Sequence, residues 1–225
     1  MAERRLMIFD WDGTLMDSEA RIVAAMQGAC RDLGLEVPDR ERACDVIGLG
    51  LAEALHRLVP DLPDHRHAEM AKRYRYYYLE ADPTPTPLFP GAMELLEGLE
   101  AAGHLLAVAT GKGKAGLEQA LAESGLVGRF HATRTAEETR SKPHPQMLEE
   151  LLDFTGCEPH EAVMVGDTEY DLLMARNAGM PAVGVTWGVH WPERLRETGP
   201  EALVSTMDEL ARWLHGGGQR EDESA

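Results

Sequence analysis

Four short, uninterrupted apolar runs recur along this 225-residue chain, and each is separated from the next by a segment long enough to contain helices. Strands that are buried on both faces of a parallel sheet have such continuous apolar sequences. The alternation predicts an α/β fold in which βαβ units form a parallel sheet. The runs are Leu6 to Phe9, Leu105 to Ala109, Ala162 to Val165 and Ala182 to Val185, with Phe130 to Thr133 as a weaker fifth strand.

Residues 17–81, between the first apolar run and the rest of the predicted sheet, have a different pattern. Apolar side chains recur there at helical intervals, and no stretch resembles a strand. Residues 82–91 are rich in proline, which is typical of a semi-rigid hinge or linker. We therefore predict a Rossmann-like core with an inserted α-helical cap domain. The predicted core comprises residues 1–15 and 88–215, the cap with its hinge residues 16–87, and a disordered tail residues 216–225.

The chain is acidic, with 39 Asp and Glu residues against 22 Lys and Arg residues and a formal net charge of -17. This charge disfavours binding to the phosphate backbone of nucleic acids, so we expect no nucleic-acid partner. A small anionic substrate would also be repelled at long range. Such a substrate would need a concentrated positive site or a metal ion in order to bind.

The cysteines and the apolar segments indicate where the protein acts. Cys30, Cys44 and Cys157 are widely spaced, without a C-x-x-C pair or zinc-type spacing, which fits a reducing compartment. The apolar run after Arg5 is too short for a secretory signal, and no run approaches the roughly 20 apolar residues of a membrane span. We expect a cytoplasmic protein without a membrane partner, either a monomer or a homodimer.

Polar side chains follow the first apolar run, where ligands of open parallel sheets bind. Asp10 and Asp12, in the sequence Asp-Trp-Asp-Gly-Thr-Leu, place two carboxylates at the mouth of a buried strand. A simple turn is the alternative interpretation, because Asp and Gly are turn residues. A turn does not require two acids that repel each other, however. Two like charges crowded at a strand mouth usually indicate a bound cation. Asp10 and Asp12 are therefore candidate ligands of a cation.

The second run ends in Thr110-Gly111-Lys112-Gly113-Lys114-Ala115-Gly116. A hydroxyl group and exposed backbone amides suit phosphate oxygens. The same stretch also matches the dinucleotide fingerprint G-x-G-x-x-G, and a turn without any ligand is a third interpretation. The lysines at Lys112 and Lys114 are unusual in that fingerprint, and the strand that should supply a ribose-binding acid is the weakest of the five. We favour phosphate binding by Thr110 and Gly111.

Two further segments carry candidate charges. Asp167 comes directly after the third strong run and its following glycine. Asp171 lies one helical turn later, on the same side of the expected helix. Capping of the following helix is the alternative role, because acids complement the helix dipole in a first turn. Lys142 precedes a proline that we expect at the first position of a helix, which would place the lysine at the start of that helix.

The candidate residues form a coherent set when their positions at the sheet edge are combined. Asp10, Asp12 and Asp167 can hold Mg²⁺ through oxygen, while Thr110 and Lys142 face a phosphoryl group from the other side. An aspartate at such a site can attack phosphorus and form an acyl phosphate. A second carboxylate can protonate the leaving oxygen and then activate water. This chemistry splits hydrolysis of a phosphate ester into two displacements.

Four motifs carry a resemblance to a known superfamily. The segments Asp10 to Ser18, Ala109 to Gly111, Ser141 to Pro143 and Gly166 to Asp171 resemble, in order and spacing, the four motifs of the haloacid dehalogenase-like (HAD) hydrolases. The insertion after the first motif resembles the helical cap of the phosphoglycolate phosphatase-like branch. The dehalogenases themselves lack the second acid of the first motif, so the presence of Asp12 favours phosphoryl transfer. The lysines and glycines of residues 112–116 depart from many relatives.

The resemblance implies a role for each matching residue. Asp10 would be the nucleophile and Asp12 the acid/base, and Thr110 and Lys142 would bind the phosphoryl group. The implied metal ligands are Asp10, Asp12 through its carbonyl oxygen and Asp167, with Asp171 in support. A glycine turn in the cap, with Gly48 and Gly50, would overhang the substrate together with Gly111, although a plain helix-breaking turn is an equal alternative for the cap glycines.

These implications predict an enzyme, a Mg²⁺-dependent phosphatase acting on a small phosphomonoester resembling phosphoglycolate. A phosphomutase of the same branch and a phospho-accepting signalling module are the alternatives. The pair His65 and His67 suggests a metal site, but side chains two residues apart diverge on a helix, so we expect both to be solvated. The basic, aromatic run Arg73 to Tyr78 is interpreted as the end of a cap helix, and Trp187 as a packing or rim residue.

Overall fold

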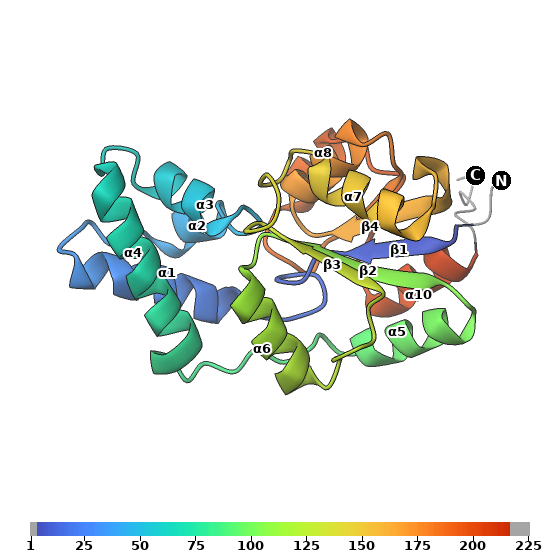
Figure 1. The fold of residues 1–225 in the computed structure, drawn as a ribbon, viewed down its shortest axis with the longest axis horizontal. Coiled ribbons are helices and arrows are strands. Elements are labelled where there is room, and N and C mark those ends of the chain that lie inside the picture. Colours follow the sequence, from blue (N-terminus) through green and yellow to red (C-terminus); the bar gives the residue numbers. More distant parts are fainter. Residues whose placement is uncertain (1–3, 217–225) are drawn as a thin grey trace.

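The computed structural model describes residues 4–216 and contains a six-stranded parallel sheet with the strand order β3-β2-β1-β4-β5-β6 (Figure 1). Strand β1 lies in the middle, so that Leu6 is opposite Leu105 on one side and Ala162 on the other. The α/β fold predicted from the apolar runs is confirmed. The strands are β1 (Leu6–Phe9), β2 (Leu105–Thr110), β3 (Ala132–Thr135), β4 (Ala162–Gly166), β5 (Ala182–Val185) and β6 (Ala202–Val204).

Two of these strands differ from the sequence prediction. Strand β3 begins two residues after the predicted Phe130, because the pairing with β2 joins Ala107 to Ala132. Strand β6 was not predicted. It has only three residues, Ala202–Val204, and its apolar sequence is too short to stand out from a loop. It extends the sheet by pairing with β5.

Helices cover both faces of the sheet. One face packs against α5 (Ala92–Ala101), α6 (Lys114–Ser124) and α10 (Met207–His215), and the other against α7 (Gln146–Thr155), α8 (Glu169–Asn177) and α9 (Pro192–Glu197). A single 3-10 turn, η2 (Pro159–Glu161), precedes β4. Because both faces are covered, every residue of β1 is buried, which explains why its sequence is continuously apolar.

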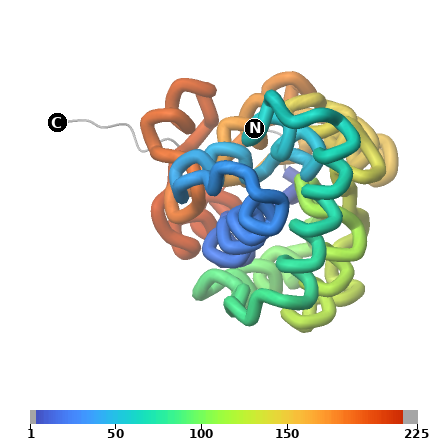
Figure 2. The backbone as a smooth tube through the Cα atoms, turned by 90° about the vertical axis from the view of Figure 1, so that its left-hand side faces the viewer, coloured from blue at the N-terminus to red at the C-terminus, as the bar shows by residue number. Residues whose placement is uncertain are grey.

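The segment between β1 and α5 forms a separate group of helices at one end of the sheet (Figures 1 and 2). It has its own hydrophobic cluster, which includes Met26, Leu55 and Met70. We propose that residues 16–87 are a cap that packs as a unit on the core. Its elements are α1 (Glu19–Asp32), α2 (Arg40–Cys44), α3 (Leu51–Leu58), α4 (Asp64–Tyr76) and the π-helical turn η1 (Tyr77–Ala81).

Three further sequence expectations concern the described chain. His67 was expected on a solvated face, but it is only 4% exposed, because α4 turns it toward α3. Cys30, Cys44 and Cys157 are all free thiols. Among residues 4–216, no helix has the length and apolar character needed to cross a bilayer. The predicted disordered tail lies outside the described residues except for Gly216.

Candidate active site

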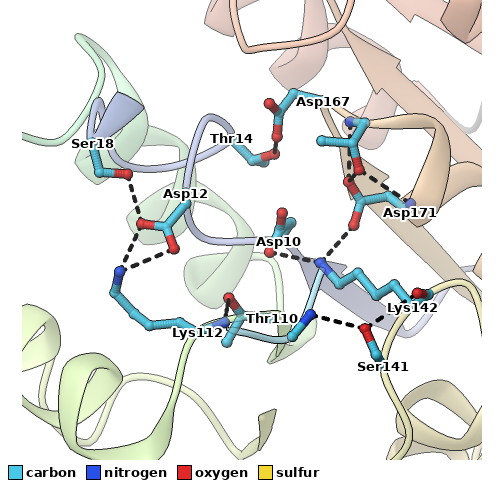
Figure 3. A network of polar contacts seen from close by, with 12 residues as sticks. Asp10, Asp12, Thr14, Ser18, Thr110, Lys112, Ser141, Lys142, Asp167 and Asp171 are labelled. Carbon is cyan, nitrogen blue, oxygen red and sulfur yellow. Dashed lines mark hydrogen bonds and ion pairs between the residues drawn. The ribbon is translucent and has the colours of Figure 1, made fainter. Parts of the chain in front are cut away.

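The predicted acids and hydroxyl meet at the carboxyl edge of the sheet. Asp10 follows β1, Thr110 is the last residue of β2, and Asp167 follows β4. The strand order changes direction at β1, since β2 and β3 lie on one side and β4 to β6 on the other. Open α/β sheets bind ligands at such a switch point. Figure 3 shows the resulting cluster of polar side chains.

Lys142 reaches the centre of this cluster from the loop after β3. Its Nζ lies 2.8 Å from Asp10 Oδ1 and 2.6 Å from Asp171 Oδ1, and the side chain is fully buried. Burial alone would lower the pKa of Lys142, but the charges of Asp10 and Asp171 outweigh it and raise the pKa, so the ammonium group stays charged. The predicted position at a helix start is wrong. Helix α7 begins at Gln146, because Pro145 rather than Pro143 precedes its first turn.

Asp171 holds Lys142 and the start of helix α8. While its Oδ1 accepts from Lys142, its Oδ2 accepts hydrogen bonds from the backbone N–H of Thr168 at 3.1 Å and from Thr168 Oγ1 at 2.7 Å. The capping interpretation of Asp171 is therefore correct, and the residue also orients the buried lysine. Both of its oxygens have partners. Support of a metal ion by Asp171 stays a prediction.

Asp10 differs from Asp171, because its carboxylate oxygens lack hydrogen-bond donors among the described residues. The side chain is fully buried, and neither oxygen accepts an aligned hydrogen bond from any residue in the described range 4–216; Lys142 contacts Oδ1 as an ion pair only. Burial raises the pKa of Asp10 well above its usual value, partly offset by the charge of Lys142. A buried carboxylate with an unpartnered oxygen fits a group that binds a cation or attacks an electrophile.

Asp167 is clamped beside Asp10. Its Oδ1 accepts a hydrogen bond from Thr14 Oγ1 at 2.7 Å, and its Oδ2 accepts one from the backbone N–H of Val189 at 2.8 Å. A Cβ atom at Gly13 or at Gly188 would lie 2.2 or 2.3 Å from Asp167 Oδ2, so only glycine fits at these two positions. Burial, with the charge of Asp171, raises the pKa of Asp167 to about 7.

The three buried acids are close enough to share an ion. One carboxylate oxygen from each of Asp10, Asp167 and Asp171 lies within 4.8 Å of the others. Only one cation, Lys142, contacts this group among the described side chains. When its three acids are ionised the cluster carries an excess of negative charge, which a divalent cation would relieve.

Asp12 lies apart from these acids, at the boundary between core and cap. Its carboxylate accepts from Ser18 Oγ at 2.6 Å and from Lys112 Nζ at 2.8 and 3.0 Å. Lys112 Nζ also donates to the hydroxyl of Tyr78 in the cap, at 2.8 Å. Lys112, whose role the sequence left open, thus contacts both Asp12 and the cap. Among the described residues, the side chain of Lys114 contacts only Glu138, in an exposed ion pair.

A cavity of about 310 Å³ lies between cap and core, beside these groups. The glycines predicted to bind substrate, Gly48, Gly50 and Gly111, all line it, together with Asp10, Asp12, Thr110 and Lys112. The cap contacts the core closely here. The backbone N–H of Gly50 donates to Ser141 Oγ at 2.8 Å, and a Cβ atom at Gly111 would lie 2.4 Å from the carbonyl oxygens of Gly48 and Leu49.

The close approach at Gly111 also decides between interpretations of the glycine-rich stretch. In a dinucleotide site the exposed glycine backbone faces a pyrophosphate. Here the cap carbonyls of Gly48 and Leu49 occupy that face of Gly111. Thr110 Oγ1 accepts a hydrogen bond from the backbone N–H of Lys112 at 3.1 Å, which leaves its hydroxyl proton free for a phosphoryl oxygen.

Several contacts that position the site could not be identified from the sequence, which left Trp187 as either a packing or a rim residue. Ser18 contacts Asp12, Thr14 contacts Asp167, and Tyr78 contacts Lys112. The indole N–H of Trp187 donates to the carbonyl oxygen of Thr14 at 3.1 Å and holds the loop after β1. Thr14 and Ser18 lie within the first motif, and this position was the only indication in the sequence that they belong to the site.

Known proteins are similar to this chain in sequence and in fold. Residues 7–185 match the family of haloacid dehalogenase-like hydrolases. A probable phosphatase, IndB, of Dickeya dadantii is 37% identical over 93% of each chain, and the pyrophosphatase PpaX of Bacillus pumilus is 29% identical over 91% of this chain and 93% of its own. A crystal structure of a predicted phosphoglycolate phosphatase from Haemophilus somnus superposes with a TM-score of 0.86 at 25% identity, covering 94% of this chain and 98% of the other. The chain belongs to the haloacid dehalogenase-like hydrolase family.

Proposed function

We propose that this hydrolase is a phosphatase that cleaves a small phosphomonoester through an aspartyl-phosphate on Asp10. The observation that carries the proposal is the placement of Asp10. Its carboxylate is buried at the switch point of the sheet, contacts Lys142 and opens onto the cavity under the cap. Thr110 and Asp12 line the same cavity. These are the groups that a two-step phosphoryl transfer requires.

The residues present fit a Mg²⁺ ion. Asp10 Oδ2 is buried and accepts no hydrogen bond from residues 4–216, and Asp167 lies beside it with its oxygens fixed in place. Mg²⁺ prefers oxygen ligands and binds few carboxylates plus water and substrate phosphate. Asp10, Asp167 and the main-chain carbonyl of Asp12 would hold the ion. When bound, it would screen the negative charge of the phosphoryl group from the carboxylates.

The first displacement uses Asp10 and Asp12. A carboxylate oxygen of Asp10 attacks phosphorus, the bond between phosphorus and the ester oxygen breaks, and protonated Asp12 gives its proton to the leaving alkoxide. Lys142 and the hydroxyl of Thr110 stabilise the charge that gathers on the phosphoryl oxygens. The products of this step are an alcohol and an acyl phosphate on Asp10.

The second displacement regenerates the enzyme. Asp12, now a carboxylate, takes a proton from a water molecule while the water oxygen attacks phosphorus, and the acyl phosphate bond to Asp10 breaks. The contacts of Asp12 with Lys112 and Ser18 hold its carboxylate in place for this step. Orthophosphate leaves, and Asp10 is again a free carboxylate. A phospho-accepting signalling module would stop before this step, so multiple turnover distinguishes it from a phosphatase.

The cavity also favours a particular class of substrate, a small phosphomonoester with a second acidic group, as in 2-phosphoglycolate. The three N–H groups of Lys112 Nζ donate to both carboxylate oxygens of Asp12 and to Tyr78, so Lys112 would act on a ligand in the cavity through its positive charge. Arg75 also lines the cavity, whose remaining walls include apolar cap residues such as Ile22 and Met26. The charges of Lys112 and of Arg75, which also pairs with Glu137, lie in the same cavity and would complement a carboxylate on the substrate.

A panel of phosphate compounds with Mg²⁺ tests this proposal. We expect kcat/KM to be higher for 2-phosphoglycolate than for its methyl ester, pyrophosphate or acetyl phosphate. In Lys112→Met the efficiency should fall at least about tenfold more for 2-phosphoglycolate than for the methyl ester, a difference of about 1.4 kcal/mol in transition-state binding. The exposed Lys114→Met is the matched control and should behave like the wild type.

Other outcomes of the panel identify the alternatives. The highest efficiency on pyrophosphate would place the chain with the pyrophosphatases, and conversion of β-glucose 1-phosphate to glucose 6-phosphate without release of orthophosphate would identify a phosphomutase. Equal losses for 2-phosphoglycolate and its methyl ester in Lys112→Met would show that Lys112 acts only through Asp12. The substrate class would then be wrong, while the proposed phosphatase chemistry would stand.

The buried acids predict how pH changes stability in the absence of metal. The pKa of Asp167 is raised to about 7, and that of Asp10 is also raised, so the folded chain binds protons that the unfolded chain releases above about pH 4. The metal-free protein should therefore become more stable as the pH falls from 8 to 5, and Mg²⁺ should stabilise it more at pH 8.

Thermal melts with and without Mg²⁺ at both pH values check this prediction. We expect the Mg²⁺-induced rise in Tm to be at least about 4 °C larger at pH 8 than at pH 5, which corresponds to roughly 1 to 2 kcal/mol for a chain of this size. Asp167→Asn, which cannot titrate, is the control and should lose most of the difference. A rise in Tm that is equal at both pH values would contradict the assignment of the metal to these acids.

A further inference from the structure

A second group of potential metal ligands lies in the cap, away from the acids at the sheet edge. One ligand atom from each of His56, Asp64 and His67 lies within 4.8 Å of the others. His56 is in the last turn of α3, and Asp64 and His67 are in the first turn and at the fourth position of α4. None of the three lines the cavity described above. The sequence suggested a pair of His65 and His67, but the spatial partner of His67 comes from the preceding helix.

Hydrogen bonds to the backbone fix which nitrogen of each imidazole carries the proton. His56 Nδ1 lies 2.8 Å from the carbonyl oxygen of Ala52, and His67 Nε2 lies 3.0 Å from that of Val59. A carbonyl oxygen only accepts, so these two nitrogens are the donors in the neutral rings. The lone pairs are therefore on His56 Nε2 and His67 Nδ1. Histidines that bind metals in proteins have the same arrangement, with the other ring nitrogen donating to a carbonyl.

The lone pair of His67 is unsatisfied. His67 is only 4% exposed, and its Nδ1 has no hydrogen-bond partner among residues 4–216. A buried polar atom without a partner costs free energy, so natural structures rarely retain one without a reason. A cation at this point would satisfy the nitrogen. His56 Nε2 lies 3.7 Å from Oδ1 of the third member, the exposed Asp64.

We propose that His56, Asp64 and His67 bind a Zn²⁺ ion in the cap. Two imidazole nitrogens and one carboxylate form a donor set that suits Zn²⁺, with water as the fourth ligand, whereas Mg²⁺ prefers oxygen alone. The two rings are stacked, with centroids 3.8 Å apart and planes at 13°. Binding therefore requires one ring to tilt so that both lone pairs meet at the ion. The half-exposed ring of His56 has room to do so.

The position of the site gives it a structural effect on the cap. The ion would join the end of α3 to the start of α4 across the connecting residues 59–63. Helix α3 begins directly after Gly50, which lines the active-site cavity and donates to Ser141 of the core. Bound Zn²⁺ would therefore stabilise the pair of helices α3 and α4. The first of these begins at the contact between Gly50 and the core.

Titration of the full chain with Zn²⁺ tests the site. Metal is first removed with a chelator, and saturating Mg²⁺ is then present so that the acids at the sheet edge are occupied. We expect one Zn²⁺ per chain by calorimetry, a higher Tm on binding, and d–d absorption bands when Co²⁺ replaces Zn²⁺. His56→Ala should weaken binding at least about tenfold, because a ligand is lost. His56 is half exposed, so this variant should fold.

Two control variants make the result decisive. His65→Ala removes an exposed neighbour outside the cluster, and Asp167→Asn removes an acid at the sheet edge; both should bind Zn²⁺ as the wild type does. Affinity in His56→Ala equal to that of the wild type, an equal loss in His65→Ala, or loss of binding in Asp167→Asn would overturn the proposal. So would the absence of wild-type binding tighter than about 0.1 mM. Because these readouts do not involve turnover, they are independent of the proposed phosphatase function.

Discussion

Asp10→Asn is expected to lower kcat by at least about three orders of magnitude, on the scale of removing a nucleophile from other enzymes. An amide is a poor nucleophile toward phosphorus and a weaker metal ligand than a carboxylate. Asp10 is buried among other acids and opposite Lys142, so no other described carboxylate occupies the same place. Steady-state release of orthophosphate with Mg²⁺ measures the effect.

The fold should survive this change, because it removes one of several repelling acids. A thermal melt of Asp10→Asn checks this. Asp17→Asn, an exposed acid in the same loop, is the matched control and should retain wild-type activity. If the folded Asp10 variant kept more than about a tenth of the wild-type turnover, a loss smaller than 1.4 kcal/mol, the nucleophile would be another residue.

Lys142→Met is expected to reduce both turnover and stability. The substitution removes the charge that stabilises the phosphoryl oxygens, and loss of one such group costs on the order of 100-fold to 1,000-fold in kcat. It also leaves Asp10 and Asp171 buried without their common partner. Removing one member of a buried ion pair typically costs about 3 to 5 kcal/mol in the free energy of unfolding. Denaturant melts and initial rates measure the two effects.

The chain offers a control for each effect of Lys142→Met. Lys114→Met removes an exposed lysine and should change neither quantity. Adding Asp171→Asn to Lys142→Met should recover part of the lost stability, since one uncompensated acid is then neutral, but it should not recover activity. A Lys142→Met protein with wild-type stability and more than about a tenth of wild-type turnover would show that Lys142 plays neither role.

The central part of the fold and site was predictable from the sequence for a physical reason. Strands buried on both faces must be continuously apolar, so the end of each run marks the sheet edge where ligands bind. Asp10, Thr110 and Asp167 could be placed together on that basis alone, and the structure brings them together. The helical cap was predictable because its apolar residues recur at helical intervals.

The parts that could not be predicted depend on contacts between distant segments. The link from Asp12 through Lys112 to Tyr78 exists only because the cap packs on the core, and no spacing in the sequence indicates it. His67 was misassigned because only neighbours in the sequence were compared, whereas its stacking partner His56 lies on another helix. Strand β6 was missed because three residues carry too little pattern.

Chemical trapping of the intermediate tests the central claim most directly. Asp12→Asn should form the acyl phosphate on Asp10 from a reactive substrate such as acetyl phosphate and hydrolyse it slowly, because it lacks the base for the second step. After incubation with Mg²⁺, quenching and borohydride reduction, mass spectrometry of the peptide around residue 10 should show homoserine in place of Asp10. Reduction at another residue, or no reduced residue in a sample that has consumed substrate, would contradict a covalent intermediate on Asp10.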